Sequence, residues 1–137
     1  MVLEYLINNL ANKKLHDDFG VNLLFYEQNI FNDSYIGPYG AQHAKDVKKF
    51  LKDYVKVKDK EVLVIGSWRP WIEIMALMLD AKKVTSIDYQ KIHCERPKLK
   101  MMTTFEFNEK FLNGELPKYD VVVSISSIEH AGLGRYE

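Results

Sequence analysis

Hydrophobic and polar positions follow two different rhythms along the chain, and the change falls near residue 60. In the first part, apolar residues recur at helical spacing, which predicts amphipathic helices over residues 3–15 and from about 41 to 54. Between these helices, Val21, Leu23 and Phe25 alternate with polar or smaller neighbours, which predicts a short strand or an extended arm. The second helix is expected to bury Ala44, Val47, Leu51 and Tyr54.

After residue 60, short apolar runs alternate with helical patterns, which is typical of a parallel sheet. We predict strands at Val62–Ile65, Val84–Ile87, Leu99–Thr104 and Tyr119–Ile125, and helices at Trp71–Leu79 and Phe105–Leu112. The first helix is apolar nearly all round and should be buried on every side. The last strand is apolar at consecutive positions, which predicts a fully buried central strand. Because strand–helix–strand connections are right-handed, we expect an α/β, Rossmann-like fold, a parallel sheet with helices on both faces.

Composition adds limits to this picture. The 137 residues suffice for one ordinary domain, and we divide them into an N-terminal helix and irregular arm (1–40) and the sheet domain (41–137). The net charge is zero, so charge gives no reason to expect nucleic acid as a partner. No apolar run approaches the ~20 residues of a membrane helix, and the first residues lack a secretory pattern. We therefore expect no membrane partner and a cytoplasmic location.

Two strand ends carry residues that point to a ligand. Gly66 follows the strand at Val62–Ile65, and Asp88 follows the next strand, 22 residues beyond the glycine. In Rossmann-like units a glycine at the first position lets the backbone approach the ligand, and an acid about 20 residues later binds ribose hydroxyls. This spacing predicts a nucleoside-type ligand. The other interpretations are a glycine needed for the bend and an acid that caps the turn after its strand.

At these positions the chain resembles class I S-adenosylmethionine-dependent methyltransferases. The resemblance rests on residues 62–71, on Asp88 and on residues 119–130, which end in Glu129-His130, and it covers roughly residues 41–137. Residues 126–136 also resemble a nematode (Caenorhabditis) family of uncharacterised proteins. The resemblance implies S-adenosylmethionine as cofactor and places the strand Val62–Ile65 between the strands Val84–Ile87 and Val121–Ile125. The cofactor-binding residues that it implies are Gly66, Ser67, Trp68, Asp88 and Ser126.

The glycine-rich loop of those enzymes is altered in this chain. Trp68 and Pro70 stand where the family has its second and third glycines, and Val64 replaces the acid of the first strand. Glycines at such positions let a cofactor lie against the backbone without a Cβ in the way. Two functions therefore stay open. One is a methyltransferase with an unknown acceptor, and the other is a non-catalytic Rossmann-like binding or interaction domain with a degenerate cofactor loop.

His130 is the candidate catalytic residue. It follows the last strand and should lie near the carboxyl edge of the sheet, where open α/β sheets bind ligands. Imidazole can act as a general base near neutral pH, and a ligand contact or a structural hydrogen bond are the alternatives. His93, Cys94 and Glu95 are adjacent and cannot all face one ion, so no metal site is expected.

The resemblance also implies strands beyond the fourth, so we expect a fold truncated after it. The strand Tyr119–Ile125 contains no lysine or proline that would prevent pairing with another chain. We therefore expect self-association, or a partner, at an exposed sheet edge.

Overall fold

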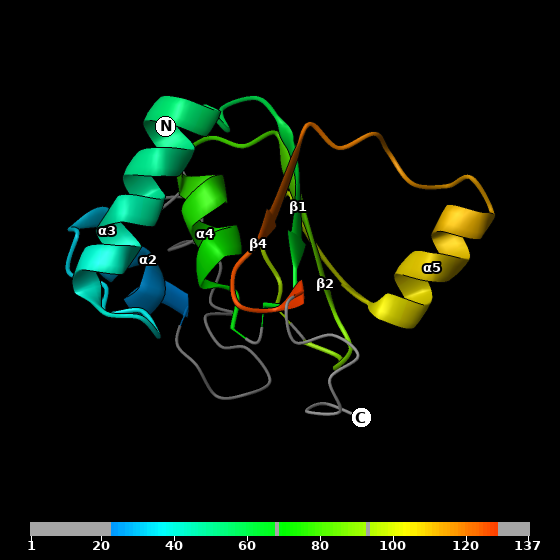
Figure 1. The fold of residues 1–137 in the computed structure, drawn as a ribbon, viewed down its shortest axis with the longest axis horizontal. Coiled ribbons are helices and arrows are strands. Elements are labelled where there is room, and N and C mark those ends of the chain that lie inside the picture. The colour runs from blue at the N-terminus through cyan, green and yellow to red at the C-terminus, as the bar shows by residue number, and fades with distance from the viewer. Residues whose placement is uncertain (1–22, 68, 93, 129–137) are drawn as a thin grey trace.

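The computed structural model describes residues 23–67, 69–92 and 94–128, which form a four-stranded parallel sheet with helices (Figure 1). The strands are β1 (Glu61–Ile65), β2 (Lys83–Asp88), β3 (Leu99–Thr103) and β4 (Val121–Ser124), in the order β3-β2-β1-β4. The helices are α2 (Leu23–Phe31), α3 (Ala41–Lys49), the π-helix η1 (Phe50–Val55), α4 (Trp71–Met78) and α5 (Thr104–Leu112). The predicted fold class is confirmed, and so is the position of β1 between β2 and β4.

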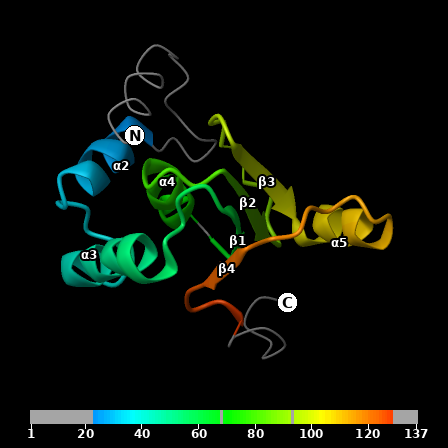
Figure 2. The same ribbon diagram turned by 90° about the horizontal axis from the view of Figure 1, so that it is seen from above.

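One face of the sheet is covered by α2, α3 and α4, whereas α5 lies on the other side (Figure 2). Alternate strand residues face the first three helices, including Val62 and Val64 of β1 and Val84 of β2, all fully buried. Every residue of α4 is buried, as its apolar pattern predicted. We call this side of the sheet the first face.

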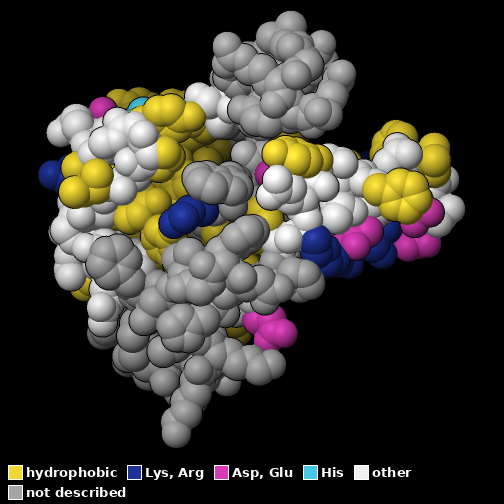
Figure 3. Space-filling view, turned by 90° about the horizontal axis from the view of Figure 1, so that it is seen from below, with side chains coloured by type: hydrophobic (Ala, Val, Ile, Leu, Met, Phe, Trp, Pro, Cys, Tyr) yellow, Lys and Arg dark blue, Asp and Glu magenta, His cyan; other side chains and the backbone are white. Residues whose placement is uncertain are grey.

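The opposite side, which we call the second face, holds a much smaller core. Its buried residues are Leu63, Ile87 and Met102, with Ile65, Phe107, Leu116 and Tyr119 partly buried around them. No residue of α5 is buried. Apolar side chains gather on this helix at the right of Figure 3, where Phe105, Phe111 and Leu112 are exposed.

The predicted strand or arm is wrong at Leu23 and Phe25, because residues 23–31 form α2, whereas Val21 and the helix predicted over residues 3–15 lie outside the described residues. The alternation covered too few residues to exclude a helix. The buried residues of α2 are Tyr26, Glu27 and Ile30, and this is helical spacing. The helix packs against α4, so it belongs to the same core as the sheet.

The prediction that Tyr54 is buried is also wrong. Ala44 and Leu51 are buried as predicted, and Val47 packs against the core, but Tyr54 is 72% exposed. The reason is the change from α3 to the π-helix η1 at Phe50. A π-helix holds more residues per turn, so Tyr54 is rotated away from the face that the earlier residues share.

The fourth strand is less buried than predicted. Within the described residues β4 is an edge strand that pairs with β1 alone, and Val122 is 58% exposed. Val121 and Val123 pack on the first face, whereas Val122, opposite Leu63 in register, points to the second face. The apolar sequence of a central strand was present, but no described helix or strand covers its outer side.

Candidate functional site

The candidate site lies where the carboxyl ends of β1, β2 and β4 meet. From β1 the chain crosses through α4 to β2 on one side, and the later strand β4 lies on the other side of β1. This change of direction is a topological switch point, the usual place for ligands in open α/β sheets. The fold thus brings three segments to one edge: residues 66, 67, 69 and 70 after β1, Asp88 at the end of β2, and residues 125–128 after β4.

Gly66 holds a close contact between two of these segments. Its φ is +73°, and its N–H donates a hydrogen bond to the carbonyl oxygen of Ile87 at 2.8 Å. A Cβ at this position would lie 1.6 Å from Ser127 Oγ and 2.5 Å from Ser127 Cβ. The glycine is therefore required both by its left-handed backbone and by the side chain of Ser127, which occupies the space next to its Cα. Sequence reasoning did not predict this role of Ser127.

Ser126 precedes that contact in a strained conformation. Its φ is +51° and its side chain is exposed. A non-glycine residue in the left-handed region costs free energy, and such residues are found preferentially at functional sites and tight turns. Here the strained backbone directs the following residue, Ser127, onto Gly66.

Asp88 is only 7% exposed and caps the turn that follows β2. Its Oδ1 accepts a hydrogen bond from the N–H of Gln90 at 2.9 Å. This is the turn-capping role that sequence reasoning held as the alternative to ribose binding. The two roles are compatible, because Oδ2 forms no hydrogen bond with any described residue and a carboxylate has two oxygens.

Glu73, in the first turn of α4, is the most buried acid of the site, with 0% exposure. It lies between the turn after β1 and the strand β2. Its Oε2 is 2.9 Å from Ser67 Oγ, and its Oε1 accepts a hydrogen bond from Ser86 Oγ at 2.5 Å. Ser67 Oγ also donates to the carbonyl oxygen of Arg69 at 2.6 Å.

Burial raises the pKa of Glu73 to about 7. The contacts of the carboxyl group with Ser86, with the backbone N–H of Glu73 itself and with Ser67 lower the pKa in part, and the nearby Asp88 carboxylate adds to the rise. Sequence reasoning missed this residue because α4 was considered only for its apolar positions. The available signal was a single acid, Glu73, within the otherwise apolar segment Trp71–Met78.

Aromatic side chains form a wall beside the turn. Trp71 is 5% exposed and belongs to the core, and its ring lies 5.9 Å from that of Tyr35. Arg69 is exposed, and its Nη1 donates to the hydroxyl of Tyr26 at 3.5 Å. Burial is also the main reason why the pKa of Tyr35 is raised, so this phenol stays neutral. These side chains therefore give the candidate site an apolar aromatic side and one cation, Arg69.

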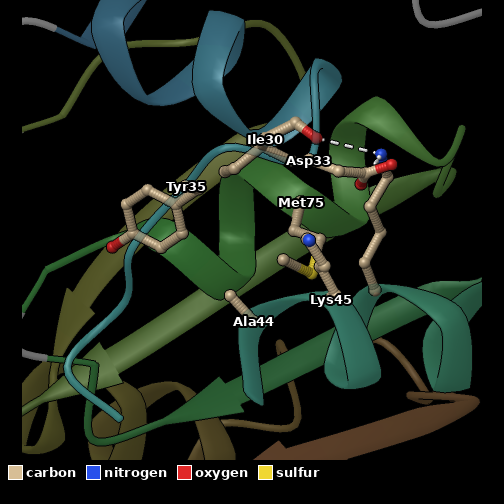
Figure 4. A pocket seen from close by; sticks show the side chains of 7 residues that line it. Ile30, Asp33, Tyr35, Ala44, Lys45 and Met75 are labelled. Atoms are coloured by element: carbon tan, nitrogen blue, oxygen red, sulfur yellow. Dashed lines mark hydrogen bonds and ion pairs between the residues drawn. The ribbon is translucent and has the colours of Figure 1, made fainter. Parts of the chain in front are cut away.

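A separate hollow, with a cavity volume of about 10 Å³, lies between the α2–α3 connection, α3 and α4 (Figure 4). Its lining includes Ile30, Tyr35, Ala44 and Met75, and Lys48 closes one side by an ion pair with Asp33 at 2.9 Å. Ligand pockets are usually ≈ 300–1,000 Å³, so this hollow is too small for a nucleoside cofactor.

The remaining predicted site residues, Trp68 and His130, lie outside the described residues. Within the described ranges no group of three or more His, Cys, Asp or Glu side chains is arranged to hold a metal ion. None of the described helices is long and apolar enough to cross a membrane.

Residues 59–137 match the model of a family described as "Caenorhabditis protein of unknown function, DUF268". The chain belongs to this family. No curated protein matches the chain. The match includes all four strands, α4, α5 and the three segments that meet at the carboxyl edge. Helices α2 and α3, the residues Tyr26 and Tyr35, and most of the lining of the hollow in Figure 4 precede it. The part of the fold that builds the switch point is therefore the part that defines the family.

Proposed function

We propose that the carboxyl edge of the sheet binds a nucleoside cofactor, S-adenosylmethionine, and that the domain transfers its methyl group to an acceptor that is still unknown. The observation that carries the proposal is the position of Asp88. It ends β2 beside β1 and Gly66, at the switch point, with one carboxylate oxygen used by the turn and the other unused by any described residue. The resemblance to class I methyltransferases supports the choice of cofactor.

The two halves of this cofactor fit the described residues unequally. Asp88 suits the ribose, because its second carboxylate oxygen can accept a hydrogen bond from a hydroxyl. The methionine half would lie over Gly66, where Ser127 already fills the space next to the Cα. Methyl transfer depends chiefly on how donor and acceptor are positioned, so few side chains are needed for it.

A non-catalytic nucleoside-binding domain is the second candidate. The contact of Ser127 with Gly66 favours it, because a ligand with a ribose but no methionine half would not meet Ser127. Adenosine and S-adenosylmethionine therefore distinguish the two functions.

Calorimetric titration of the 137-residue chain with S-adenosylmethionine, S-adenosylhomocysteine and adenosine tests both. Asp88→Asn keeps an oxygen for the N–H of Gln90 but loses the charge, so it should weaken binding about thirtyfold, or ~2 kcal/mol. Asp53→Asn, at an exposed acid of η1, is the control and should leave affinity unchanged.

The three ligands give different results for the two candidate functions. Binding of all three ligands, with transfer of labelled methyl to an acceptor in a cell extract, supports the methyltransferase. Binding of adenosine alone supports the second candidate, and in that case Ser127→Gly should restore affinity for S-adenosylmethionine. If no ligand binds, or if Asp88→Asn binds as well as wild type, the proposal is wrong.

A further inference from the structure

The polar cluster beneath the turn after β1 contains one more hydrogen bond than its two hydroxyl groups can supply. Ser67 Oγ lies 2.6 Å from the carbonyl oxygen of Arg69 and 2.9 Å from Glu73 Oε2. A serine hydroxyl carries one proton, and a carbonyl oxygen can only accept. If Ser67 donates to Arg69, the contact with Glu73 needs a proton on the carboxyl group.

The contact on the other side of Glu73 does not supply that proton. Ser86 Oγ donates to Oε1, and its single proton is used there. A neutral acid with its proton on Oε2 therefore satisfies all three hydrogen bonds: Ser86 to Glu73, Glu73 to Ser67, and Ser67 to Arg69. A carboxylate would leave two protons for three bonds, and Ser67 would have to release one of its partners.

We propose that Glu73, as a neutral acid, is a positioning residue that holds the described turn residues 66, 67, 69 and 70 against β2, and that its ionisation frees the carbonyl oxygen of Arg69 from Ser67 and loosens this turn. The residue is suited to this role because it is fully buried and joins the two segments directly. Ser67 belongs to the turn, and Ser86 lies two residues before Asp88 on β2.

The surrounding charges act in the same direction. Asp88 on β2 repels a carboxylate at Glu73, and Tyr35, from the connection between α2 and α3, is a buried neutral phenol. The cation of the turn, Arg69, is exposed and directs Nη1 to the Tyr26 hydroxyl. No other charged side chain lies on α4. Burial raises the pKa of Glu73 to about 7, so the two forms interconvert near neutral pH.

Amide hydrogen exchange on the 137-residue chain tests the turn itself, with rates corrected for the intrinsic effect of pH. In wild type, protection of the hydrogen-bonded amides of the turn, those of Gly66 and Trp71, should fall about tenfold between pH 6 and pH 8. This is the change expected for a group whose pKa of about 7 returns to 4.5 when the turn opens. In Glu73→Gln the amide N–H₂ replaces the acid proton permanently, so protection should stay high at both pH values.

Glu109→Gln, on the exposed side of α5, is the matched control and should keep the wild-type response. Equal wild-type protection at pH 6 and pH 8, or an unchanged pH response in Glu73→Gln, would overturn the proposal. If Glu73→Gln does not fold, the same exchange measurement on Ser67→Ala tests the proposal. It removes the shared hydroxyl, so protection of the turn should be low at both pH values, and a wild-type pH response in this variant contradicts the proposal.

The effect on ligand affinity rests on the proposed function. If the turn forms part of the site, affinity for adenosine should fall from pH 6 to pH 8 in wild type and not in Glu73→Gln. A pH-dependent turn without any nucleoside binding would count against the proposed function alone.

Discussion

The two faces of the sheet are built in opposite ways. On the first face, α2, α3 and α4 pack over the alternate strand residues that point toward them, and all eight residues of α4 are buried. The second face has three buried residues, and its helix, α5, has none. Both faces come from sequences rich in apolar residues, so apolar content alone does not decide burial. Burial depends on how many helices and strands pack against a face.

The charged and polar side chains of the two faces also differ in burial. On the side of the first face, Glu27 of α2 pairs with Arg96 at 2.7 Å, with side chains 0% and 2% exposed, and Glu73 sits beneath the turn after β1. On the second face, ion pairs such as Lys110–Glu115 are exposed. Tyr119 Oη and Ser124 Oγ are buried without a hydrogen-bond partner among the described residues. The second face is the less covered one because it has three buried apolar residues and a helix with none.

The largest effect should come from breaking the buried ion pair. Glu27→Gln removes the negative charge from an ion pair whose two side chains are both buried, and we expect a loss of about 3–5 kcal/mol in the free energy of unfolding. Glu115→Gln, which breaks the exposed pair on the other side, should cost less than about 1 kcal/mol. Urea denaturation measures both, and similar losses would contradict the contrast between the faces.

Truncation of apolar side chains sharpens the same contrast. Ile74→Ala removes a fully buried side chain of α4 and should destabilise by about 3 kcal/mol, because the helix is enclosed and cannot collapse into the cavity. Phe111→Ala on α5, where the ring is 66% exposed, should change stability by about 0.5 kcal/mol or less. If Phe111→Ala costs as much as Ile74→Ala, a further segment covers α5.

The pH dependence of stability should originate from Glu73. Its pKa is raised on folding, so its contribution is fully present below about pH 4.5 and is lost as pH rises through 7. The loss amounts to about 3 kcal/mol, because each unit of pKa corresponds to ~1.4 kcal/mol. Denaturation midpoints at a series of pH values should show this slope in wild type and in Glu109→Gln but not in Glu73→Gln. If Glu73→Gln keeps the pH dependence of stability, another titratable group causes it.

The start of α5 allows a smaller test on the sparsely covered side. Thr103 and Glu106 form a capping box, in which Thr103 Oγ1 accepts from the Glu106 N–H at 3.1 Å. Because α5 has little tertiary packing, its stability should depend on the cap. Thr103→Ala should therefore lower the free energy of unfolding by about 1 kcal/mol. Thr103→Ser keeps the hydroxyl and should restore most of it. Circular dichroism with urea denaturation gives both values, and an unaffected Thr103→Ala variant would show that packing holds α5.

The last test concerns the uncovered edge and has the smallest expected effect on the monomer. We propose that β4 is the surface through which the chain self-associates, because its outer backbone groups are unpaired within the described residues and Val122 is exposed. Val122→Lys should reduce association in light scattering at about 100 μM while changing stability by ~0.5 kcal/mol or less. Val122→Thr is the uncharged control. A wild-type monomer under these conditions contradicts the proposal.

Much of the fold could be predicted from short-range patterns. The strands, α3, α4 and α5 lie within a few residues of their predicted bounds, because apolar periodicity reflects which side of each element is buried. The pattern failed at Leu23 and Phe25, because an alternation over so few positions cannot distinguish a strand from a helix. It also failed at Tyr54, because nothing in the local pattern indicated a π-helix.

The sequence by itself determined the order of elements and the edge at which Gly66 and Asp88 lie, since strand periodicity and right-handed crossovers are set by local chemistry. Only the tertiary structure decided what surrounds those residues. Ser127 lies against Gly66, 61 positions earlier in the chain, and Glu73 is buried between Ser67 and Ser86 because α4 packs on β2. Such contacts depend on the distance between segments in space, and burial, pKa and hydrogen bonding follow from that distance and not from the neighbours in sequence.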